Sequence, residues 1–372
     1  MTETVRTDAG SGTSAVVSGV GTGFAAVTMA ALVVPIRRGV EAPSVWAGAA
    51  FAIVCVLAFL ASRRTGIDRR IVSAVAAVSS AVVVIVSAYA LNQGITASVP
   101  LPIGSWSLSL VFVAFFTAGL TAGIGVAQFV GIDGGGLKDR SLHTTSLTVL
   151  GLGGLVAAQV ATALVALPLM LVIGTLSLTQ LVVVSQLGMA LGTGAVAIGY
   201  LVYRGDGLSY LDLEMPTVRD ALWIVAGVFV LFGALMAISA VFYTVGVESS
   251  EHGTAQQAQT NPEILLVLIP ASLLIIGPFE ELLYRNVIQK SLYETFSRYG
   301  AVVVGSVVFA IVHVLAYGTA GPGEVIASLG VIFGLSLVLG TIYERTENLV
   351  VPAVIHGIYN AILFTNLYAM YA

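Results

Sequence analysis

Ionisable and amide side chains within long apolar segments are the features of this sequence that could do chemistry. Glu280 and Glu281 lie in PFEELLYR, and His313 lies in the apolar run AVVVGSVVFAIVHVLAY. His356 and Asn360 lie in VPAVIHGIYNAILF. Two histidines and a carboxylate form the ligand set of a hydrolytic zinc site. The same groups could equally hold and deprotonate a water molecule, with His and Asn donors left to stabilise an oxyanion.

Each group also has a purely structural interpretation. On a helix, Glu281 and Arg285 are four residues apart in the order that favours an ion pair, whereas Glu280 points about 100° away, towards Tyr284. One carboxylate therefore has a local partner and the other does not. A salt bridge on an interfacial helix would explain the first carboxylate without any catalysis.

The histidines allow the same two interpretations. His313 follows Phe309 by four residues on one helix face, as a packed histidine could. His356 and Asn360 also share one face, beside Gly357, and could simply hydrogen-bond to each other between turns. Ionisable residues inside a membrane cost about 2.5–3.5 kcal/mol each on insertion scales, so they are functional candidates by default. A purely structural account would need every one of these separate interpretations to be correct at once. A single functional site is therefore the favoured explanation.

The composition places these residues in a membrane protein. Of the 372 residues, 58% are hydrophobic and 9% are charged, whereas soluble domains carry about 25% charged residues. This excludes a soluble enzyme, and a net charge of -4 without a basic patch excludes a nucleic-acid partner. The single cysteine, Cys55, excludes a disulfide framework and Cys-based zinc sites.

The apolar segments predict an all-α, polytopic transmembrane helix bundle of about 11 spans. Each crossing of the bilayer core needs about 20 apolar residues, and the uncharged run 145–203 is long enough for two. The predicted spans are 15–36, 46–62, 71–91, 107–131, 145–173, 177–203, 220–246, 263–279, 300–317, 324–343 and 349–371.

Basic residues between the spans predict the orientation of the bundle. The loop containing Arg63, Arg64, Arg69 and Arg70 is expected in the cytoplasm, because cytoplasmic loops carry an excess of Lys and Arg. Alternating from there places the amino terminus in the cytoplasm, the carboxyl terminus outside, and the candidate site nearer the cytoplasmic face. Membrane lipids are the expected surroundings.

The chain divides into parts of different character. Residues 1–203 are expected to form about six membrane helices of unknown role, and residues 204–219 a polar cytoplasmic linker. Residues 220–372 would form a catalytic helix bundle whose motif core is 260–372. Gly277-Pro278 is expected to break the eighth span, so that a second, amphipathic helix begins at the proline.

The three motifs together resemble the CPBP intramembrane proteases, which include the type II CAAX prenyl endopeptidases and bacteriocin-immunity-like proteins. The resemblance rests on EExxxR from Glu280, FxxxH from Phe309 and HxxxN from His356, in this order, and covers about 260–372. It implies an endopeptidase acting on a substrate with a lipidated or membrane-embedded segment.

The resemblance also implies roles for individual residues. Glu280 and His313 would activate the attacking water, and His356 with Asn360 would bind the oxyanion. Glu281, Arg285 and Phe309 would hold these catalytic residues in place. Members are commonly described as metalloproteases, so two mechanisms are open. Either Glu280, His313 and His356 hold a zinc ion, or Glu280 activates the water without a metal.

Two other functions remain open from the residues. A secondary transporter would also have many spans and buried Glu and His, but the polar residues of the second half have no counterpart in the first half. A catalytically inactive scaffold or immunity-type protein would keep the motifs only for packing.

Overall fold

The computed structural model describes residues 9–63, 67–102 and 104–372, with side chains described from residue 16 onward. Arg64, one of the basic residues behind the predicted orientation, lies outside the described residues. The described part of the chain is almost entirely helical, and its strands β1 (Ser98–Pro100) and β2 (Ser107–Ser109) form one short antiparallel pair. The predicted all-α fold is confirmed.

Within the described residues, eleven helices are long and apolar enough to cross a membrane, the number predicted from the sequence. The uncharged run 145–203 divides at a turn where Gly174 has a φ of +80°, and Ser177 forms a capping box with Gln180. The eleven helices are α1 (Ala9–Arg37), α2 (Pro43–Ala61), α3 (Arg69–Asn92), α4 (Leu110–Phe129), α5 (Gly134–Ile173), α6 (Leu178–Arg204), α7 (Val218–Val245), the helix Ile264–Leu292, α12 (Arg298–Val312) continued by η4 (His313–Leu315), α13 (Pro322–Thr346) and α14 (Val350–Tyr371).

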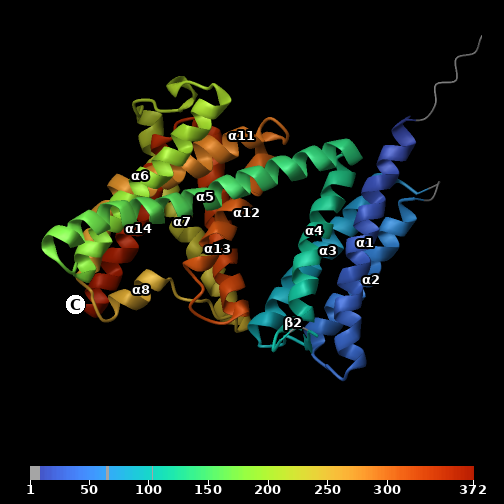
Figure 1. The fold of residues 1–372 in the computed structure, drawn as a ribbon. Helices are drawn as coiled ribbons and strands as arrows, with labels where there is room; N and C mark the ends of the chain where they lie inside the picture. Colours follow the sequence, from blue (N-terminus) through green and yellow to red (C-terminus); the bar gives the residue numbers. More distant parts are fainter. Residues whose placement is uncertain (1–8, 64–66, 103) are drawn as a thin grey trace, which may run out of the picture. The chain divides into compact units, whose positions relative to one another are not determined.

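The chain folds into two compact units. The first comprises the described residues up to 141 together with 321–327, and the second comprises 142–320 and 328–372, so α5 and α13 contribute to both. In the first unit, α1, α2, α3 and α4 lie side by side (Figure 1) and pack through small apolar residues such as Ala52, Ala114 and Ala118.

The second unit contains all three motifs. α14 packs against α7 and against the helix Ile264–Leu292, which also contacts α6 and α12. Two further short elements, η1 (Leu208–Tyr210) and α8 (Gly253–Ala258), belong to this unit. A core of buried side chains from the helix Ile264–Leu292 and from α12 surrounds the motif residues.

Residues 142–203 pack directly on the helix that carries the first motif. A Cβ placed on Gly194 of α6 would lie 3.1 Å from the ring of Phe279, and one placed on Gly154 of α5 would lie 2.6 Å from Leu283. At these two glycines, α5 and α6 pack closely against the motif helix. The functional boundary predicted at 204–219 stays a prediction.

The helix Ile264–Leu292, called the motif helix below, is continuous. It consists of α9 (Ile264–Ala271), the π-helical η2 (Ser272–Ile276), α10 (Gly277–Glu281), the π-helical η3 (Leu282–Gln289) and α11 (Lys290–Leu292). The expectation that Gly277-Pro278 breaks the eighth span and starts a second helix was therefore wrong.

The geometry around Pro278 explains why the helix continues. Proline lacks an N–H and its ring clashes with the carbonyl of the preceding turn in an α-helix. Here the preceding turn is π-helical, and the Gly277 N–H donates to the carbonyl of Ser272, five residues earlier. This wider turn accommodates the proline ring without ending the helix.

Gly277 has a different purpose, because it lets α14 approach the motif helix. A Cβ on Gly277 would collide with the carbonyl oxygen of Ala353 and lie 2.9 Å from the Gly357 nitrogen. A Cβ on Gly357 would in turn lie 2.7 Å from the Ser272 carbonyl oxygen. The two glycines bring the backbones carrying the first and third motifs into direct contact.

Candidate active site

The first motif forms a fully buried ion pair. Arg285 Nε donates to Glu281 Oε2 at 2.9 Å, and both side chains have an exposed fraction of 0%. Arg285 Nη1 also donates to Ser336 Oγ on α13 at 3.0 Å. The i, i+4 pair predicted from the sequence is thus present, and α13 holds its cationic end.

His356 of α14 lies between the two glutamates of the motif helix. Its Nδ1 is 2.9 Å from Glu281 Oε1, and because an ionised carboxylate can only accept, Nδ1 carries the proton. Its Nε2 is 3.9 Å from Glu280 Oε2. Glu281 therefore orients the imidazole and stabilises positive charge on it, while the other ring nitrogen faces Glu280.

His313 ends α12 and begins η4. Its Nδ1–H donates to the Phe309 carbonyl oxygen at 2.7 Å, which leaves Nε2 with a lone pair able to accept a proton. The centroids of the Phe309 and His313 rings are 4.4 Å apart, and those of Phe309 and His356 are 6.2 Å apart. Phe309 is thus the packing contact shared by the two histidines.

The ring of Phe309 also contacts the motif helix. Its centroid lies 4.8 Å from Cζ of Arg285 and 5.1 Å from the Tyr284 centroid, with the two aromatic rings nearly perpendicular. These contacts fix the second motif against the first, since aromatic and guanidinium groups pack on a ring in defined geometries.

Asn360 lies one helical turn after His356 on α14 and is partly buried. Its side chain forms no hydrogen bond with any described residue, so the alternative in which His356 and Asn360 bond to each other does not hold in the structure. The amide of Asn360 is available to donate to a group that enters the site.

Two residues near the site were missed by the sequence analysis. The His252 ring, which precedes α8, packs edge-on against Tyr317 with centroids 5.0 Å apart. Burial and the negative charge of Glu280 raise the pKa of Tyr317 to about 12, and burial and the charge of His313 lower the pKa of His252 to about 4. Tyr317, four residues after His313, could have been found by helical spacing, but no sequence signal connects His252 to the motifs.

The zinc alternative depends on how close the candidate ligand atoms lie to one another. Within the part of the chain that the structure describes, no three His, Cys, Asp or Glu side chains are gathered so that they could hold a metal ion. His356 Nε2 and Glu280 Oε2 are 3.9 Å apart, close to the separation of two ligand atoms that each lie about 2.0–2.2 Å from one tetrahedral zinc. The bond from His356 Nδ1 to Glu281 is also usual for a zinc-bound histidine. The zinc set Glu280, His313 and His356 expected from the resemblance stays a prediction.

Comparisons with known proteins agree with the motif pattern. Residues 262–362 match the family described as type II CAAX prenyl endopeptidase Rce1-like. A protein of Bacillus subtilis (strain 168), named "Putative membrane peptidase YdiL", is 28% identical over 141 residues, which are 37% of this chain and 53% of that protein. The chain thus spans about half the length of this relative, and no solved structure matches.

The family match covers Glu280, Phe309, His313, His356 and Asn360. Of these residues, His356 contacts both Glu281 and Phe309. The eleven apolar helices make the chain an integral, multi-pass membrane protein. Residues 262–362 are thus similar to the Rce1-like type II CAAX prenyl endopeptidases, which agrees with the resemblance of the three motifs to the CPBP intramembrane proteases.

Proposed function

We propose that this protein is an intramembrane endopeptidase in which Glu280 acts as the general base. The observation that carries the proposal is that the adjacent residues Glu280 and Glu281 are bonded very differently. Glu281 is fully buried and committed to Arg285 and His356, whereas Glu280 is only in loose contact with His356 Nε2 at 3.9 Å. A carboxylate beside a histidine, but not bound tightly by it, can hold a water molecule.

The proposed reaction needs no group beyond those of the chain. Glu280, with His313 Nε2 as a second acceptor, takes a proton from water while the water oxygen attacks the scissile carbonyl carbon. The carbonyl oxygen gains negative charge and accepts hydrogen bonds from His356 Nε2–H and the Asn360 amide. Glu280 then gives its proton to the leaving nitrogen, and the C–N bond breaks to give a carboxylic acid and an amine. The remaining proton of the acid passes to the amine, which leaves a carboxylate and an ammonium.

His356 can donate to the oxyanion only when Nε2 is protonated. Because Nδ1 already donates to Glu281, this requires an imidazolium, which the adjacent carboxylates stabilise. Glu281 thereby supports the oxyanion site through His356. This is a role for Glu281 beyond the helix-holding ion pair expected from the sequence.

The membrane location defines the proposed substrate class. The site residues lie on helices long and apolar enough to span a bilayer, so a peptide with a lipidated or transmembrane segment would reach them by lateral diffusion. We propose that the site opens nearer the cytoplasmic face and that the amino terminus is cytoplasmic, because of the basic loops.

The test is cleavage of a prenylated CAAX reporter and of a transmembrane-peptide pool by the purified protein in liposomes. Glu280→Gln should lower the cleavage rate by about 10²–10⁴-fold, which is the usual contribution of a general base. Glu263→Gln is the matched control, because Glu263 immediately precedes α9 of the same motif helix and is exposed; it should cleave at the wild-type rate.

Two outcomes would overturn parts of this proposal. Equal cleavage by wild type and Glu280→Gln would exclude Glu280 as the base. Loss of wild-type activity with a chelator, restored by zinc, would replace the metal-free mechanism with a metal-dependent one. Absence of cleavage by folded wild type on the whole pool would favour an inactive scaffold.

A further inference from the structure

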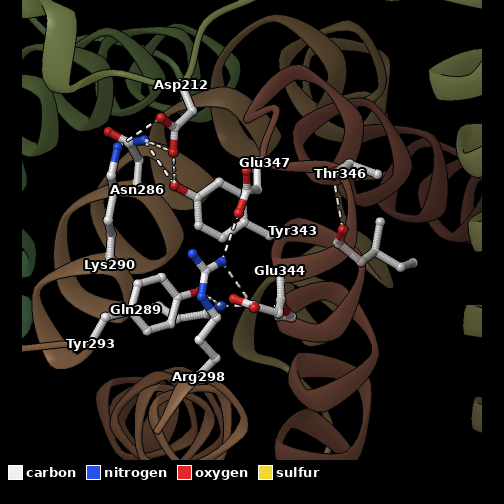
Figure 2. Close-up of polar contacts among 12 residues, drawn as sticks. Asp212, Asn286, Gln289, Lys290, Tyr293, Arg298, Tyr343, Glu344, Thr346 and Glu347 are labelled. Atoms are coloured by element: carbon white, nitrogen blue, oxygen red, sulfur yellow. Dashed lines mark hydrogen bonds and ion pairs between the residues drawn. The ribbon is translucent and has the colours of Figure 1, made fainter. Parts of the chain in front are cut away.

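The polar linker between α6 and α7 has a specific attachment that the proposed reaction does not use. Its Asp212 is bonded to two helices at once, as Figure 2 shows. Asp212 Oδ1 accepts from Lys290 Nζ at 2.7 Å, and Asp212 Oδ2 accepts from Asn286 Nδ2 at 3.3 Å and from the Tyr343 hydroxyl at 2.5 Å. Asn286 and Lys290 belong to the motif helix, and Tyr343 to α13.

The backbone of the same linker holds a third helix. The Leu349 N–H donates to the Asp212 carbonyl oxygen at 2.7 Å, directly before α14 begins. Asn348 Nδ2 also donates to the Glu214 carbonyl oxygen at 3.2 Å. One short linker segment therefore bonds to the motif helix, to α13 and to the start of α14.

These three helices are the ones that carry the buried charge cluster of the site. Glu281 lies five residues before Asn286, Ser336 seven residues before Tyr343, and His356 seven residues after Leu349. At 1.5 Å per residue, each attachment point is about 8–10 Å along its helix from the site residue. Asp212 thus joins the three helices that carry Glu281, Ser336 and His356, at points about 8–10 Å along each helix from these residues.

We propose that Asp212 is a positioning residue that sets the register between Glu281 and His356. The hydrogen bond between these two residues is 2.9 Å long and crosses from the motif helix to α14. A slip of either helix along the other by about one ångström would lengthen or misalign it, and misplacement of this size can cost about 10²-fold in rate. Asp212 opposes such a slip because it bonds to both helices.

The environment of Asp212 suits a fixed anchor. Its side chain is 24% exposed and that of Lys290 is 26% exposed, so the pair is only partly screened by solvent. Asn286 has no exposed surface, and the Lys290 ammonium also packs over the ring of Tyr210 at 4.3 Å. Removal of the carboxylate would leave a buried amide, a hydroxyl and an ammonium without their shared acceptor.

The first measurement compares Asp212→Asn with Asp206→Asn. Asp206 is the matched control, because it lies in the same linker and pairs only locally with Arg204, two residues away. With the cleavage reporter, which rests on the proposed function, Asp212→Asn should lower kcat about 10–100-fold with little change in KM. Asp206→Asn should leave both constants at wild-type values.

A second measurement does not require activity. In protein labelled with ¹⁵N-histidine, the Nδ1 resonance of His356, assigned through its loss in His356→Gln, reports the hydrogen bond to Glu281. Asp212→Asn should shift this resonance and Asp206→Asn should not. Tyr343→Phe, which removes one hydroxyl from the anchor and keeps the ring, should shift it in the same direction by a smaller amount.

The two measurements separate the possible failures. An unchanged His356 resonance in folded Asp212→Asn would overturn the positioning role, even if the thermal midpoint fell. A shifted resonance in a protein that cleaves no peptide would support the positioning role and count against the proposed function instead.

Discussion

The interiors of the two compact units both contain polar side chains, but of different kinds. In the first unit most are short hydroxyls that bond mainly to their own helix; the amide of Gln128, which donates to Ser18 Oγ on α1 at 3.0 Å, is an exception. Thr28 Oγ1 bonds to the Phe24 carbonyl at 2.9 Å and to Thr117 Oγ1 at 2.8 Å, and Ser80 Oγ bonds to the Ala76 carbonyl at 2.8 Å. Each has a partner within one turn, so little depends on a neighbouring helix.

In the second unit the buried polar groups include an ionised pair that depends on other helices. Glu281 and Arg285 have no exposed surface, and their remaining bonds go to His356 on α14 and to Ser336 on α13. A charge in a low-dielectric interior is tolerated only when paired. The comparison shows that polarity inside a membrane bundle is not itself a sign of chemistry. The informative feature is a charge whose partners lie on several helices.

The largest effect that this difference predicts is on removal of the Glu281 charge. Glu281→Gln leaves Arg285 buried without its counter-ion and replaces the charged acceptor of His356 Nδ1–H with a neutral amide. Loss of one partner of a buried pair costs about 3–5 kcal/mol, so both the thermal midpoint in detergent and peptide cleavage should fall. Glu280→Gln should lower cleavage alone, since Glu280 is not part of the buried ion pair.

Thermal unfolding of the two variants side by side is the decisive measurement. If Glu281→Gln unfolded at the wild-type temperature, the charge cluster would not stabilise the second unit, and the proposed division between the two glutamates would be wrong.

An intermediate loss of stability and activity is expected where the motif helix meets α14, at Gly277. Gly277→Ala places a methyl group against the Ala353 carbonyl and 2.9 Å from the Gly357 nitrogen, which forces α14 away from the motif helix. Overpacking of this kind costs about 1–3 kcal/mol, and displacement of His356 from Glu281 should lower cleavage about 10–100-fold.

The control for this substitution is Gly330→Ala on α13. No atom lies within 4 Å of a Cβ at Gly330, so this variant should keep its activity and be as stable as wild type or slightly more stable, because Ala favours a helix over Gly. If both alanine variants behaved alike, close approach at Gly277 would not be what positions the site.

The sequence predicted the features that depend on one segment at a time. Hydropathy gave the eleven spans, because each segment alone must be apolar enough for the bilayer. Helical spacing gave the Glu281–Arg285 pair, which lies within a single helix. The order of the motifs identified the helices that carry the site.

Features that depend on two segments were not predicted. The bond between Glu281 and His356 joins residues 75 positions apart, and nothing in either motif indicates which glutamate His356 approaches. Gly277 was interpreted as a helix breaker because its packing partner, Ala353, lies on another helix. The attachment of Asp212 to Asn286 and Tyr343 likewise has no local signal.

The smallest effect is expected in the first unit, where removal of a buried hydroxyl should matter little. Thr28→Val keeps the shape of the side chain, and Thr117 keeps its bond to the Val113 carbonyl, so no buried group loses its last partner. Interhelical hydrogen bonds in membranes average about 0.6 kcal/mol, so the thermal midpoint should fall only slightly and cleavage should not change. A loss as large as that of Glu281→Gln would show that the hydroxyls of the first unit act between helices after all, and the contrast between the two interiors would fail.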